Sequence, residues 1–157
     1  METSYHENYA KQLQRLLSVV TKSQKKYIDA SDYVDSADFK NLFNRYADER
    51  KNIITELKEA IHKLGGKINN TDEAEIGSHH WNSTHSGQDP KKDQAVLEKI
   101  RNSEQETLDT YDDVLQGTIL EEFNLKTLIM SQRLSINEAF TEIERRYFSL
   151  FKLSQPY

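Results

Sequence analysis

Residues 57–66, with the sequence LKEAIHKLGG, end a long amphipathic segment at two adjacent glycines. Leu57, Ile61 and Leu64 recur at the spacing of one helix face, and paired glycines are a typical helix stop. Towards the N-terminus the same face continues to Ser36, where the pattern breaks and a further apolar stripe precedes it. The break is too short for a parallel return. We therefore predict an antiparallel hairpin of two helices, at about residues 5–34 and 37–64.

Downstream of the glycines, the sequence predicts a second pair of helices. Asp89 suits the N-cap and Pro90 the first turn of a helix over residues 90–116. Gly117 ends that helix, and Thr118-x-x-Glu121 resembles a capping box that starts a fourth helix over residues 119–152. The polar connection, residues 65–89, is long enough to run the length of the bundle and to contain a short extra helix.

These elements predict one domain over residues 1–157. The fold class is all-α, an antiparallel four-helix bundle with a long crossover between the second and third helices. The predicted core stripes comprise Tyr9, Leu13, Leu16, Leu17, Val20, Gln24, Tyr27, Ala30 and Val34 in the first helix; Phe39, Leu42, Phe43, Tyr46, Arg50, Ile53, Leu57, Ile61 and Leu64 in the second; Val96 or Leu97, Ile100, Glu104, Leu108, Tyr111, Val114 and Leu115 in the third; and Phe123, Leu125, Leu128, Gln132, Ile136, Ala139, Phe140, Ile143 and Tyr147 in the fourth.

Each stripe is interrupted near its middle by one polar residue: Gln24, Arg50, Glu104 or Gln132. Buried charges in an apolar core must be paired and hydrogen-bonded. We therefore expect a structural polar layer in which Arg50 meets Glu104, with the glutamines and core tyrosines satisfying the remaining polar groups.

Composition excludes several classes of function. The chain has a net charge of -5 and no concentrated basic patch, which argues against a nucleic-acid partner. It contains no cysteine, which excludes disulfides and thiolate sites. No apolar run has the length of a membrane span, and the N-terminus does not resemble a signal peptide. We expect a soluble, cytoplasmic protein.

Several short motifs occur together in a characteristic order. They are Tyr27, Leu42-Phe43, Asp48-Glu49-Arg50, Leu57, Leu64-Gly65-Gly66, Gly77-Ser78-His79-His80-Trp81, Ser103-Glu104, Tyr111 and Leu115. In this order and spacing the chain resembles a bacterial family of four-helix-bundle proteins, a domain of unknown function within the ferritin-like superfamily. The resemblance implies a ferritin-like crossover and no particular reaction.

Ferritin-like di-iron sites take one Glu from each of two helices and Glu-x-x-His from each of the other two. Here the first helix offers Gln24 on its inner face, and Glu49 is followed three residues later by Asn52. Glu59 and His62 have the right spacing but lie off the apolar stripe, and the fourth helix contains no histidine. We therefore expect no cofactor.

An alternative prediction keeps a metal, either iron or manganese. It uses Glu49 and Glu104 in the centre of the bundle with Arg50 displaced, or the imidazoles of His79, His80 and His85 in the connection.

The sequence thus predicts a non-catalytic protein with a structural or interaction role. A ferritin-like metal-binding protein or degenerate di-iron oxidoreductase is the alternative. No nucleophile elbow or glycine-rich phosphate loop is present. Apolar residues left over from the stripes predict a homo-oligomer formed through a helix face; they are Ile54, Ile119, Phe148 and Phe151.

Overall fold

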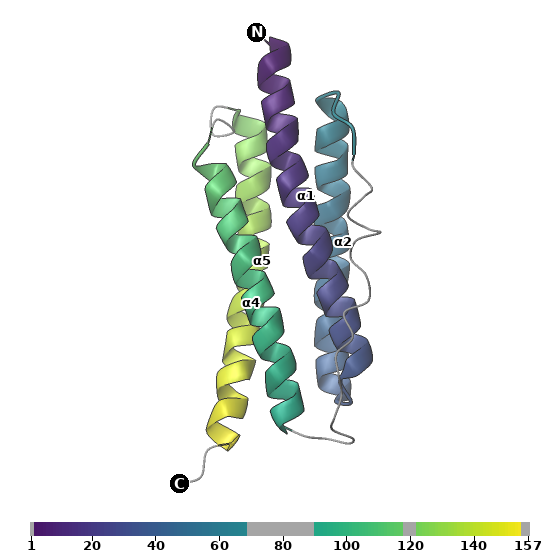
Figure 1. The fold of residues 1–157 in the computed structure, drawn as a ribbon, viewed down its shortest axis with the longest axis vertical. Helices are drawn as coiled ribbons and strands as arrows, with labels where there is room; N and C mark the ends of the chain where they lie inside the picture. Colours follow the sequence, from purple (N-terminus) through teal and green to yellow (C-terminus); the bar gives the residue numbers. More distant parts are fainter. Residues whose placement is uncertain (1, 69–89, 118–121, 155–157) are drawn as a thin grey trace.

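A computed structural model describes residues 2–68, 90–117 and 122–154, and within these ranges the chain forms four helices and no strand. They are α1 (Glu2–Tyr33), α2 (Ala37–Lys63), α4 (Pro90–Leu115) and α5 (Phe123–Ser154). α1 and α2 pack closely, as do α4 and α5, and α1 also packs along α4. The predicted all-α, antiparallel four-helix bundle is confirmed (Figure 1).

The turn between α1 and α2 follows the predicted break in the apolar pattern. The Ser36 side chain accepts a hydrogen bond from the backbone N–H of Phe39 at 3.3 Å, and so caps the start of α2. Val34 remains bonded to the last turn of α1 through its N–H and the Ala30 carbonyl, 3.0 Å apart. This short link makes α1 and α2 an antiparallel hairpin (Figure 1).

The two glycines close α2 with a Schellman motif. Gly65 has a φ of 78°, which favours glycine, and its N–H bonds the His62 carbonyl. The Gly66 N–H bonds the Ile61 carbonyl at 3.0 Å. A Cβ atom on Gly66 would lie 3.0 Å from that of Ala10, so this glycine also lets the start of α1 approach the end of α2.

The end of α2 and the start of α4 lie at opposite ends of the bundle, so these two helices run parallel (Figure 1). That arrangement is the long crossover expected of a ferritin-like bundle. α4 begins at Pro90, as predicted. The predicted short helix in the connection and the Asp89 cap lie outside the described residues.

The predicted start of α1 is wrong, because α1 begins at Glu2 rather than at about residue 5. The structure describes α5 from Phe123, and its predicted start at about residue 119 lies outside the described residues. The carboxylate of Glu122 accepts hydrogen bonds from the N–H groups of Asn124 and Leu125, at 3.2 and 2.8 Å, and thereby supplies the first-turn partners. Thr118 and Glu121 lie outside the described residues.

The core consists of two apolar clusters. One includes Leu13 to Val20 of α1 and Ile53 to Ile61 of α2, and the other includes Tyr27 to Val34 of α1 and Leu42 to Ala47 of α2. The α4 residues divide in the same way, Leu108 to Val114 belonging to the first cluster and Val96 to Ile100 to the second. Polar residues occupy the level between the two clusters, and they form the candidate site.

The core predictions need three corrections. Ile54 is buried in the first apolar cluster, so it is not available for a surface contact. In α5, Ile129 is buried although it was not predicted to be, whereas Phe123 is 75% exposed. Leu125 is buried as predicted, so the core-facing side of α5 is the predicted one and Phe123 lies off it. None of the described helices contains a stretch long and apolar enough to cross a membrane.

Candidate functional site

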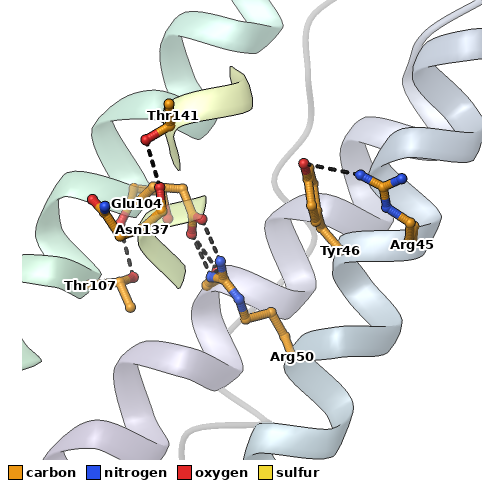
Figure 2. Close-up of polar contacts among 9 residues, drawn as sticks. Arg45, Tyr46, Arg50, Glu104, Thr107, Asn137 and Thr141 are labelled. Carbon is orange, nitrogen blue, oxygen red and sulfur yellow. Dashed lines mark hydrogen bonds and ion pairs between the residues drawn. The ribbon is translucent and has the colours of Figure 1, made fainter. Parts of the chain in front are cut away.

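The centre of the bundle holds a buried ion pair between Arg50 of α2 and Glu104 of α4. Arg50 Nη1 donates to Glu104 Oε1 at 2.6 Å, and Arg50 Nη2 donates to Glu104 Oε2 at 2.5 Å. Both side chains are only 1% exposed. The two parallel contacts make the pair bidentate, the strongest geometry open to these groups (Figure 2). The predicted pairing of Arg50 with Glu104 is therefore observed.

Helix α1 contributes Ser23 to this pair. The Ser23 hydroxyl accepts from Arg50 Nη1 at 2.5 Å and donates to Glu104 Oε1 at 2.9 Å. The sequence prediction placed Gln24 here, which is wrong, because Gln24 is only half-buried while Ser23 is 1% exposed. Both residues fit a helical repeat between Val20 and Tyr27. The small hydroxyl is the one that reaches both charged groups, and we define Ser23, Arg50 and Glu104 as the central triad.

The ring of Tyr27 packs against the central triad from the side of the second apolar cluster. The Arg50 Cζ atom lies 5.4 Å from the Tyr27 ring centroid, which is a cation–π distance. Tyr46 and Phe43 surround the same ring, at centroid distances of 5.5 and 6.1 Å. The Tyr27 hydroxyl is buried and makes no hydrogen bond with the described residues. Tyr27 thus contacts the triad through the face of its ring, while its hydroxyl lies near the Glu104 carboxylate without the geometry of a hydrogen bond.

Burial and charge fix the protonation of these groups. Burial alone would lower the pKa of Arg50, but the Glu104 carboxylate outweighs it and the pKa lies above its usual value. Burial, and secondarily the Glu104 charge, raise the pKa of Tyr27 well above its usual value. The guanidinium therefore stays charged and the phenol stays neutral throughout the physiological pH range.

A second hydrogen-bonded cluster lies towards the first apolar cluster. The Tyr111 hydroxyl of α4 donates to Gln132 Oε1 at 2.8 Å, and Gln132 Nε2 of α5 donates to Glu56 Oε1 at 3.3 Å. Burial raises the pKa of Tyr111. Gln132 was predicted in the polar layer and is 3% exposed, but its partners are Tyr111 and Glu56 rather than the ion pair. Sequence reasoning missed Glu56, since that residue lies on the exposed side of the α2 stripe.

The residues at the centre do not fit a di-iron site. Among the buried polar residues of the described ranges, Glu104 is the single carboxylate, and Arg50 and Ser23 hydrogen-bond to its oxygens. α1 and α5 supply Ser23 and Gln132, which are a hydroxyl and an amide rather than carboxylates. Over residues 2–68, 90–117 and 122–154, no three His, Asp or Glu side chains are grouped so as to hold a metal.

The other predicted metal candidates do not join the centre. Glu49 is half-buried, and Arg50 rather than Glu49 faces Glu104. Glu59 and His62 are both exposed near the end of α2. His79, His80 and His85 lie outside the described residues, so the imidazole cluster stays a prediction.

A surface pocket of about 620 Å³ opens where the start of α1, the end of α2 and the start of α5 meet. Its apolar lining includes Tyr9, Leu125 and Leu128, and Glu56 and Glu59 stand among its charged lining residues. Glu56 therefore links the pocket to the buried Gln132 through a hydrogen bond. Three helices distant in sequence form this pocket, and no local motif indicates it.

The fold and the central triad together define a ferritin-like four-helix bundle whose centre is an ion pair. The chain belongs to the family described as Domain of unknown function (DUF2383), which matches residues 8–117. No curated protein matches the chain.

Among solved structures, the fold is similar to that of a dodecameric thioferritin, the bacterioferritin-related protein from Bacteroides fragilis. The TM-score is 0.75 at 15% sequence identity, over 94% of this chain and 89% of that chain. At this identity the similarity establishes the shared fold alone.

Proposed function

We propose that this protein is a non-catalytic ferritin-fold bundle that acts through association of its surface, with a polar centre that serves stability. The central triad is the observation that carries the proposal. Both oxygens of the buried Glu104 carboxylate are engaged by Arg50, and Ser23 bonds one of them as well. A metal at Glu104 would have to displace Arg50 and leave a buried guanidinium unpaired, at a cost of about 3–5 kcal/mol.

The protonation states support the same proposal. General acid–base catalysis near neutral pH needs a group whose pKa lies near the working pH. The pKa values of Arg50, Tyr27 and Tyr111 are all raised from values that already lie far above neutrality. These three groups keep their protons, so none of them is suited to act as a base.

Self-association is the kind of interaction that the fold similarity favours. The similar solved protein from Bacteroides fragilis is described as dodecameric. Ferritin-like bundles present long helix faces, and such faces suit the symmetric contacts of homo-oligomers. We extend this property to the present chain as part of the proposal.

The alternative function is metal binding, with iron or manganese held either by Glu49 and Glu104 or by His79, His80 and His85. The solved structure with a similar fold is described as a thioferritin. This description supports testing metal binding as the alternative function. The two candidate ligand sets lie on different segments of the chain. Substitutions in each set can therefore show which one holds a metal.

Elemental analysis decides between the two functions. The full chain, purified without a His-tag, is incubated with iron or manganese under air and passed through gel filtration. We expect metal well below one ion per chain. Stoichiometric metal would contradict the proposal, and two variants would then locate it. Loss in Glu104→Gln would indicate the bundle centre, and loss in a His79→Ala/His80→Ala/His85→Ala variant would indicate the connection.

A further inference from the structure

The outer face of α5 exposes a row of large apolar side chains. Phe123 is 75% exposed, Met130 52%, Leu134 61% and Phe148 46%. Only two other large apolar side chains of the described residues are comparably exposed, Tyr5 and Ile28 on α1. Four of the six exposed large apolar side chains in the described ranges therefore lie on a single helix.

These four side chains lie along one line of the helix surface. At 3.6 residues per turn they fall within about 40° of one another around the helix axis. Ile129, Ile136 and Ile143 occupy the opposite face and are buried in the bundle. Between Phe123 and Phe148, four other residues lie within about 40° of the stripe line: Thr127, Asn137 and Thr141 are uncharged, and Arg145 is ion-paired with Glu142. We call the row of Phe123, Met130, Leu134 and Phe148 the α5 stripe.

An exposed apolar stripe along a whole helix marks a contact surface. From Phe123 to Phe148 the α5 stripe runs about 37 Å, at 1.5 Å per residue. This length matches one long helix of the same fold, and a straight, narrow seam of apolar residues fits the stripe of another helix. The geometry thus favours a helix as the occupant.

We propose that the occupant is a second copy of this chain, with the α5 helices packed antiparallel about a two-fold axis. This inference rests on the self-association in the proposed function and names the surface that performs it. The stripe is self-complementary in this arrangement, because an aromatic residue lies at each end. When Phe123 faces Phe148 of the second copy, Met130 lies level with Thr141 and Leu134 with Asn137, both of them uncharged residues.

The charges flanking the stripe agree with this register. Lys126 and Glu144 project from the same flank of α5, about 60° from the stripe centre at 3.6 residues per turn. Arg101 of α4 lies 3.5 Å from Glu144, which places this flank on the side of α4. When Phe123 lies opposite Phe148 of the second copy, Lys126 comes within about one residue of Glu144 of the second copy along the helix axis. Two-fold symmetry forms this opposite-charge contact twice.

The seam is narrow, so we expect a reversible dimer. Its length of about 37 Å and a helix width of about 10 Å give roughly 370 Å² per chain, about half of the area of a standard specific interface. The dimer should therefore form with rising concentration rather than be obligate.

Sedimentation velocity of the full chain over a range of concentrations tests the surface. Leu134→Glu places two carboxylates at the centre of the seam and should raise the dimer dissociation constant by roughly tenfold or more. Ile28→Glu is the matched control, since it puts the same charge at the exposed apolar residue of α1. We expect it to leave association unchanged. Both variants should keep the helical circular dichroism of the parent chain, because neither residue belongs to the core.

A cross-link provides a second readout that does not depend on affinity. The chain contains no cysteine, so Leu134→Cys and Ile28→Cys each carry a unique thiol. A short bis-maleimide should produce a covalent dimer from Leu134→Cys and little from Ile28→Cys.

The outcomes distinguish a wrong choice of surface from the absence of self-association. If the parent chain dimerises but Leu134→Glu dimerises equally well and Leu134→Cys does not cross-link, the α5 stripe is the wrong surface while self-association stands. If the parent chain is monomeric at every concentration, both the α5 stripe and the proposed self-association are wrong.

Discussion

The central triad and the α5 stripe invert the usual distribution of polar and apolar groups in opposite ways. Ser23, Arg50 and Glu104 are polar and buried, and they satisfy one another within a space that excludes water. The α5 stripe is apolar and largely exposed, with only the Arg101 guanidinium over one of its rings, 5.3 Å from the Phe148 centroid. The difference teaches that the buried polar groups are satisfied within one chain, whereas the exposed apolar row is the surface that the proposed second copy would cover.

This comparison assigns stability to the centre and association to the surface. A change in the centre should therefore alter the free energy of unfolding, and a change in the α5 stripe should alter oligomeric state.

The largest single loss should come from Glu104→Gln. The substitution leaves the buried Arg50 guanidinium without a counter-charge, and we expect a loss of about 3 kcal/mol. Urea unfolding followed by circular dichroism measures it. Glu106→Gln, on the exposed face of the same helix, is the control and should change stability by less than about 0.5 kcal/mol. An unchanged or raised midpoint for Glu104→Gln would reopen the metal-binding alternative.

Removal of the Ser23 hydroxyl should have a smaller effect. Ser23→Ala deletes hydrogen bonds to both members of the ion pair but leaves the pair itself, so we expect about 1.5 kcal/mol of destabilisation. Ser31→Ala is a matched control on the same helix, because the Ser31 hydroxyl makes only a 3.5 Å contact with the Lys40 carbonyl. Equal losses in the two variants would show that Ser23 contributes by packing alone.

The two fully buried tyrosines should respond differently to loss of the hydroxyl. Tyr111→Phe removes the donor to Gln132 and should cost about 1 kcal/mol. Tyr27→Phe removes a buried oxygen that has no hydrogen-bond partner in the described part of the chain. That variant should therefore be as stable as the parent or more stable. Thermal melts of both variants check the contrast, and a clear loss in Tyr27→Phe would mean that its hydroxyl has a partner.

The surface charges of α5 should contribute least. A hydrogen bond from Arg145, followed by one from Arg146, lowers the pKa of Glu142 from 4.5 to about 2. A lowered folded-state pKa stabilises the fold above about pH 4.5, and this stabilisation is lost as the pH falls towards 2. Glu142→Gln should therefore cost under about 1 kcal/mol at pH 6 and almost nothing near pH 2. A loss that is equal at both pH values would contradict the assignment.

The buried ion pair and the crossover could be predicted from the sequence, because few other arrangements were compatible with it. Arg50 and Glu104 are the two opposite charges on otherwise apolar stripes, so their pairing follows from the cost of burying either alone. The crossover follows from the closing glycines and from the start of α4 at Pro90. Both features are local signals that agree with the global fold.

The missed features depend on rotation and tertiary context. Ser23 and Gln24 are neighbours that fit the same helical repeat, and the spacing cannot say which one faces the core. The same ambiguity led to the wrong placement of Phe123 and Ile54. α5 is apolar on both its inner and its outer face, so its pattern does not distinguish the core side from the α5 stripe. Glu56 joins Gln132 only because α2 and α5 are brought together in space.

The central claim is that Glu104 is held in the bundle to neutralise Arg50. Replacing both with residues of similar volume, Arg50→Met and Glu104→Met, tests it through the unfolding free energies of the two single variants and the double variant. We predict that each single variant loses about 3 kcal/mol or more and that the double variant recovers most of that loss. A stable Glu104→Met variant, or losses that simply add in the double variant, would contradict the claim.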